Sequence, residues 1–211
     1  MQTPLDRLGS APFTLTELAT VYPQINSITD KARRLVEQGR LIRLKQGLYI
    51  RSERETGSPL PTYLIANHLC GPSYISFHTA LRYYGLTPEG VYVVQSMTTR
   101  PNVQFSTPVG AFTYRHCSPG YFALGVTIIR ENDLSFMMAS PEKALCDLMA
   151  STPRLSLRYL KDMQQYLEDD LRFDMDALPH FNIPLLQDIA AVSPKPVAVR
   201  TLINYLTYGH F

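Results

Sequence analysis

The residues of this sequence that could take part in chemistry form a few small groups. Glu142, Lys143 and Asp147 combine two carboxylates with an amine, a set that general acid–base catalysis could use. Lys143 and Asp147 also have the i, i+4 spacing of an ion pair on one helix, and Glu142 would lie near the positive end of that helix. We therefore expect these three residues to have structural roles.

A metal site would require clustered His, Cys, Asp or Glu side chains. The neighbours His68/Cys70 and His116/Cys117 supply too few ligands, and the acid-rich stretch 168–176 is more typical of a polar loop at a helix end. The patterns GxGxxG, GxxxxGK[ST], GxSxG and HExxH are absent from the sequence. We expect no metal, no cofactor and no enzymatic activity.

The basic residues are unevenly distributed along the 211-residue chain. The net charge is +2, but residues 1–51 contain eight basic and four acidic residues and therefore carry +4, which leaves −2 for the remainder. A basic N-terminal quarter followed by a mildly acidic remainder indicates that the N-terminal quarter binds a polyanion.

Helical signals surround these basic residues. Thr14 and Glu17 have the spacing of a capping box, and Pro23 ends the apolar helical pattern that follows. Ser27 can cap a second helix, and Gly39 can end it. Its apolar stripe leaves the opposite face to polar and basic side chains.

Two short apolar segments follow, joined by Lys45-Gln46 and Gly47, and they predict a hairpin with a bulged turn. Helix, turn, helix and basic-tipped hairpin is the order of a winged helix-turn-helix, whose second helix enters the major groove. The wing would contact phosphates. The predicted DNA-binding residues are Ser27, Asp30, Lys31, Arg33, Arg34, Arg43 and Lys45. A solvated amphipathic helix, or a winged helix used only for protein contacts, is the competing interpretation.

The remainder of the chain predicts a second domain. We place the boundary in an expected loop at 53–58, between a winged domain at 1–52 and an α+β domain at 59–211. Four β-rich segments between 91 and 139 predict a mostly antiparallel sheet of about four strands, followed by a helical C-terminal region with helices at 156–168, 183–192 and 197–208. On an expected helix after Ser76, His78 and Arg82 could contact a phosphate or a partner, although a solvated face is the simpler interpretation.

The composition predicts a cytoplasmic protein that does not enter the membrane. Its apolar runs are far shorter than the roughly 20 residues of a membrane span, and the start of the chain lacks a secretory pattern. Three widely spaced cysteines, Cys70, Cys117 and Cys146, argue against a disulfide framework.

Three segments of the chain resemble the AbiEi family of antitoxins from type IV toxin–antitoxin and abortive-infection systems. They are Gly39–Tyr49, Tyr74–Leu86 and Ala139–Leu148, in that order. The resemblance implies a repressor that binds double-stranded DNA at its own promoter. It also implies an antitoxin that opposes a nucleotidyltransferase-like toxin, without an obligatory stable complex.

The leading hypothesis is therefore a DNA-binding transcriptional autorepressor and antitoxin. The alternative from another class is a metal-dependent nuclease or nucleotide-modifying enzyme with an appended winged helix. A third is a protein-interaction domain that never binds DNA.

Overall fold

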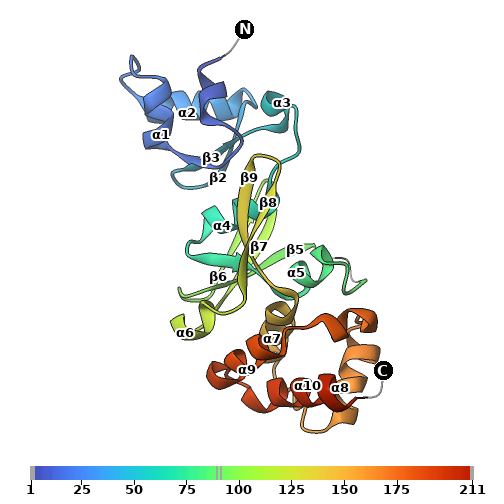
Figure 1. Cartoon of the computed structure of the whole chain (residues 1–211). Coiled ribbons are helices and arrows are strands. Elements are labelled where there is room, and N and C mark those ends of the chain that lie inside the picture. Colours follow the sequence, from blue (N-terminus) through green and yellow to red (C-terminus); the bar gives the residue numbers. More distant parts are fainter. Residues whose placement is uncertain (1–2, 89, 91, 210–211) are drawn as a thin grey trace.

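The computed structural model describes residues 3–88, 90 and 92–209 of the chain. It is an α+β molecule with three tiers (Figure 1): a small helical unit with a short sheet, a larger sheet, and a group of C-terminal helices. We call residues 3–58 the head and residues 59–209 the body. Met1 and Gln2, included in the predicted first domain, and His210 and Phe211, included in the second, lie outside the described residues.

The head packs two helices against a small antiparallel sheet of strand order β1-β3-β2. Its elements, in order, are the 3-10 helix η1 (Pro4–Leu8), β1 (Phe13–Thr14), α1 (Leu15–Val21), α2 (Ile28–Glu37), β2 (Leu41–Lys45), β3 (Leu48–Arg51) and α3 (Glu53–Thr56). The predicted capping box is confirmed, because the Thr14 backbone N–H donates to Glu17 and the Glu17 N–H donates to the Thr14 hydroxyl.

Glycine ends α2 and turns the hairpin as the sequence predicts. Gly39 (φ +67°) and Gly47 (φ +75°) adopt left-handed conformations that glycine tolerates best, and the β2–β3 pairing has a bulge between Arg43 and Lys45. The Ser27 hydroxyl accepts from the Asp30 N–H and so caps α2.

The expected loop at 53–58 is wrong for most of its length, because Glu53–Thr56 is the short helix α3. A core around Leu5, Leu18 and Leu35 fills the head. Leu44, Leu48 and Ile50 of the β2–β3 hairpin belong instead to the larger core of the body. The hairpin is therefore shared, with one side in each core.

The body contains a six-stranded sheet among the described residues, in the order β6-β7-β5-β4-β9-β8. Its elements, in order, are α4 (Thr62–Leu69), β4 (Ser73–Ile75), α5 (Phe77–Tyr83), β5 (Val93–Thr98), β6 (Val103–Thr107), β7 (Gly110–His116), α6 (Pro119–Phe122), β8 (Val126–Glu131), β9 (Leu134–Ala139), α7 (Pro141–Ser151), α8 (Leu160–Gln165), the π-helix η2 (Tyr166–Asp170), the 3-10 helix η3 (Met175–His180), α9 (Ile183–Val192) and α10 (Pro196–Tyr208).

The sheet differs from the predicted four strands. The short strand β4 and the edge strand β6 were not expected, and β4–β9 and β5–β7 pair in parallel. The other three pairings are antiparallel. Val91, the expected start of β5, lies outside the described residues.

The C-terminal helices lie at the end of the molecule opposite the head (Figure 1), beyond the sheet. The helix expected at 156–168 is shorter, because α8 begins at Leu160 and changes to a π-helical turn at Tyr166. None of the helices in the described part of the chain is long and apolar enough to cross a membrane.

Candidate nucleic-acid interface

The polar face of α2 carries most of the predicted DNA-binding residues, and the structure leaves them at the surface. Ser27, Asp30, Arg33 and Arg34 are exposed, while Ala32 and Leu35 on the other side are buried in the head core. The helix therefore presents one polar, cationic face to solvent, which is the arrangement that groove recognition requires.

Asp30 is held within this face by its neighbours. The Ser27 hydroxyl donates to the Asp30 carboxylate at 2.8 Å, and an Arg33 nitrogen lies 3.2 Å from the other oxygen. The Ser27 hydrogen bond, followed by the charge of Arg33, lowers the pKa of Asp30 from its usual value. Asp30 is therefore ionised at neutral pH and offsets part of the positive charge of the helix.

Lys31 lies at the edge of the face and is half-buried. Its ammonium is 4.7 Å from the centre of the Tyr22 ring, within the range of a cation–π contact. This contact was not predicted from the sequence, because Tyr22, the residue after α1, is far from Lys31 along the chain. The ring restricts Lys31 to one side of α2 while the charge stays at the surface.

The two predicted wing residues have different environments. Arg43 is exposed on β2. The Lys45 ammonium instead donates to the carbonyl of Leu69 at 2.6 Å and lies 5.6 Å from the centre of the Phe105 ring, both in the body. Lys45 was predicted to contact phosphates from the wing, but in this arrangement one of its three ammonium donors binds the body.

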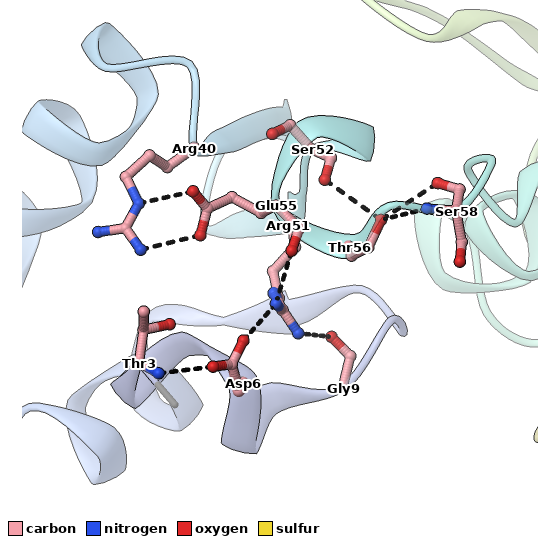
Figure 2. Close-up of polar contacts among 9 residues, drawn as sticks. All are labelled: Thr3, Asp6, Gly9, Arg40, Arg51, Ser52, Glu55, Thr56 and Ser58. Atoms are coloured by element: carbon pink, nitrogen blue, oxygen red, sulfur yellow. Dashed lines mark hydrogen bonds and ion pairs between the residues drawn. The ribbon is translucent and has the colours of Figure 1, made fainter. Parts of the chain in front are cut away.

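Two other arginines of the basic segment are used inside the head (Figure 2). Arg40 makes a two-pronged ion pair with Glu55, with both contacts at 2.8 Å, and Arg51 lies 2.6 Å from an Asp6 oxygen. The charge count for residues 1–51 missed the first pair, because Glu55 lies just beyond that limit. The exposed arginines of the head are Arg7, Arg33, Arg34, Arg43 and Arg54, and Lys31 is half-buried.

His78 and Arg82 lie on successive turns of α5 in the body, and so they belong to a different tier from α2 (Figure 1). His78 is half-buried, and Arg82 is exposed with one guanidinium nitrogen donating to the carbonyl of Pro88 at 3.2 Å. The structure therefore does not bring His78 and Arg82 together with the predicted DNA-binding residues of the head.

The predicted Lys143–Asp147 ion pair is confirmed, but it lies in the interior rather than at the surface. The two charged atoms are 3.0 Å apart, and both side chains are 0% exposed. The Ser76 hydroxyl, at the start of α5, donates to the second Asp147 oxygen at 2.6 Å. The pair therefore joins α7 to α5 inside the core of the body.

Lys143 has further contacts with Tyr121 and Gly125. Its ammonium donates to the Tyr121 carbonyl and lies 3.0 Å from the centre of the Tyr121 ring. At Gly125 (φ +63°), a Cβ would lie only 2.8 Å from Cβ of Lys143, so glycine makes room for the lysine stem. Burial lowers the pKa of Lys143 and raises the pKa of Asp147, and the attraction between the partners opposes both shifts.

Glu142, the third residue of this group, is also buried. Its carboxylate accepts the backbone N–H of Asn182 at the start of α9, which joins the two helices. Among the described residues, no three or more His, Cys, Asp and Glu side chains gather as a metal-holding group.

No protein-family model matches this chain, and no curated protein is similar enough to match.

Proposed function

We propose that this chain is a DNA-binding transcriptional autorepressor whose head is a winged helix-turn-helix, and that it also acts as an antitoxin. The observation that carries the DNA-binding part is the exposed polar face of α2, with Arg33 and Arg34 on it, above a buried apolar stripe. A helix pair followed by an antiparallel hairpin supports the winged-helix assignment.

The proposed contacts divide between base reading and phosphate positioning. Arg34 is placed at the centre of the exposed face and can reach a base edge, whereas Arg43 on β2 is suited to a phosphate. Because Lys45 is bound to the body, α2 carries the recognition and the tip of the hairpin contributes little.

The antitoxin part rests on the resemblance of Gly39–Tyr49, Tyr74–Leu86 and Ala139–Leu148 to the AbiEi family. The proposed partner is a nucleotidyltransferase-like toxin, countered functionally and without an obligatory stable complex. The second and third segments contribute Ser76, Lys143 and Asp147 to the buried network of the body. This network gives those segments a structural role in the body.

Fluorescence anisotropy with the chain's own promoter tests DNA binding. The intact protein should bind this duplex more tightly than a scrambled duplex of equal length. Arg34→Ala should weaken promoter binding by about 1–3 kcal/mol and narrow the difference between the duplexes. Arg158→Ala, at an exposed arginine beside α8, is the matched control and should bind as the parent does. Equal affinity of the parent and Arg34→Ala for the promoter would contradict the proposed recognition helix.

Co-expression with a nucleotidyltransferase-like toxin encoded beside this chain, the partner that the proposal requires, tests the antitoxin part. The intact chain should restore growth, and Arg34→Ala should also restore growth when expressed from an unrelated promoter. The same variant should fail to repress a reporter behind the chain's own promoter. Failure of the intact chain to restore growth would remove the antitoxin assignment and leave the DNA-binding assignment standing.

A further inference from the structure

A cavity of about 1000 Å³ lies where the head meets the body. The head contributes residues 8–11 to its wall, the connecting segment contributes 58–64, and the body contributes the β8–β9 turn with parts of α5 and β9. Its volume is at the upper end of the range of small-molecule sites. None of the proposed DNA contacts on α2 lines it.

One wall of the cavity is aromatic. The Tyr63 and Phe136 rings have centroids 5.3 Å apart, and the Tyr83 ring packs edge-on against Tyr63 at 5.8 Å. Tyr63 and Phe136 both line the cavity. Since Tyr83 supports them from behind, these rings form a fixed apolar surface against which a flat or aliphatic group can pack.

The rim of the cavity is acidic. Glu131 and Asp133 flank Asn132 in the tight turn between β8 and β9, where Asn132 has φ +53°, and all three line the cavity. Burial, and after it a hydrogen bond to Glu131, raise the pKa of Tyr83 to about 12.

Arg82 is the basic residue among those that line the cavity, and it already donates to the carbonyl of Pro88. The lining therefore has two carboxylates against one guanidinium. A cationic ligand fits this balance, whereas an anionic ligand would meet two like charges.

We propose that this cavity binds a small organic cation, an amine or amidinium with an aromatic or aliphatic body. The apolar part packs against Tyr63 and Phe136, and the charged end lies between Glu131 and Asp133. Cation–π attraction to the rings adds to the two ionic contacts.

The head side of the cavity is linked to the fold of the head (Figure 2). Arg51, which is 8% exposed on its side chain, donates to the carbonyl of Gly9 and pairs with Asp6. Gly9 lines the cavity, so that the head and the body share its wall.

Calorimetric titration of the full chain without DNA tests the site, so that its outcome is independent of the proposed function. The probes are tryptamine, its neutral analogue tryptophol and the anion indole-3-acetate, which share one ring system. Tryptamine should bind about tenfold more tightly than tryptophol, and indole-3-acetate should bind most weakly.

Two variants and one control locate the binding. The double variant Glu131→Gln/Asp133→Asn should abolish the preference for tryptamine, and Tyr63→Leu should weaken tryptamine and tryptophol alike. Asp188→Asn, at an exposed acid of α9, is the matched control and should behave as the parent does. Thermal unfolding of each variant checks that it is folded. The proposal is overturned if no probe binds at millimolar concentration, if the three bind equally, or if the double variant retains the preference.

Discussion

Two ion pairs of similar sequence spacing have opposite environments in the head and in the body. Asp30 and Arg33 lie 3.2 Å apart at the surface of α2, with side chains 56% and 65% exposed. Lys143 and Asp147 lie 3.0 Å apart and are fully buried. Water solvates the first pair, so that the pair contributes little to the stability of the fold. In the second pair, each buried charge is compensated by the other, and removing one would leave the other uncompensated.

The comparison also separates two uses of charge. In the head, charge at the surface is available to a partner, and the neighbouring side chains only orient it. In the Lys143–Asp147 pair of the body, charge links α7 to α5 and is inaccessible from outside. The i, i+4 spacing of Lys143 and Asp147 predicts the buried pair, whereas the Asp30–Arg33 pair was not predicted. Burial separates the roles of the two pairs.

The largest expected effect comes from breaking the buried pair. Asp147→Ala leaves the Lys143 ammonium uncompensated in the core and should destabilise the fold by about 3–5 kcal/mol. Urea denaturation measures this loss. The double variant Lys143→Met/Asp147→Leu removes both charges and should recover most of the stability. A loss below about 1 kcal/mol for Asp147→Ala would show that the pair does not hold the body together.

The next effect concerns the contact between the hairpin and the body. Lys45→Met removes the charged donor to the Leu69 carbonyl and should cost about 1.5–3 kcal/mol of stability. Arg43→Ala, two residues away and exposed, should leave stability within about 0.5 kcal/mol but lower the salt dependence of DNA binding by about one unit of slope. If Lys45→Met instead lowers that slope as much as Arg43→Ala does, Lys45 leaves Leu69 to contact phosphate.

A smaller effect is expected at the start of α1. The Thr14 backbone N–H, and after it the Thr14 hydroxyl, lower the pKa of Glu17 from 4.5. Because the folded pKa lies below the unfolded one, this contribution is complete above about pH 4.5 and is lost as pH falls through the folded pKa. Glu17→Gln should therefore be less stable than the parent near neutral pH, by about 1 kcal/mol or less. Melting temperatures from pH 3 to pH 7 should converge at the acidic end, and a constant gap would contradict this account.

The smallest effect should come from the exposed pair. Asp30→Ala should change the free energy of unfolding by less than about 0.5 kcal/mol, because the pair is solvated and Ser27 remains as the helix cap. Urea denaturation of Asp30→Ala and Asp147→Ala under the same conditions compares the two pairs directly. A loss above about 1 kcal/mol would mean that exposure does not distinguish the two pairs.

Much of the local structure could be predicted from the sequence. The capping box at Thr14, the cap at Ser27, and the turn glycines at Gly39 and Gly47 are all confirmed. These signals are local, since each depends on residues only a few positions apart. The winged-helix function of the head and its DNA contacts stay predictions.

Long-range features could not be predicted in the same way. The parallel pairing of β4 with β9 joins segments more than sixty residues apart, and three residues of β4 carry too little pattern to indicate it. The attachment of Lys45 to Leu69 depends on where the body lies, which no helical or strand period encodes. The burial of Lys143 depends similarly on the space left by Gly125, which lies in the turn before β8.

The shared hairpin has a consequence for how such a protein can be recombined. Leu44, Leu48 and Ile50 belong to the core of the body although they precede the domain boundary in the sequence. A chimera that joins residues 1–52 to an unrelated effector would carry these three side chains to a surface that has no matching recess. A head moved to another protein would therefore keep α1, α2 and the side of the hairpin that packs against them. The side of the hairpin that carries Leu44, Leu48 and Ile50 would have to be redesigned for each new host.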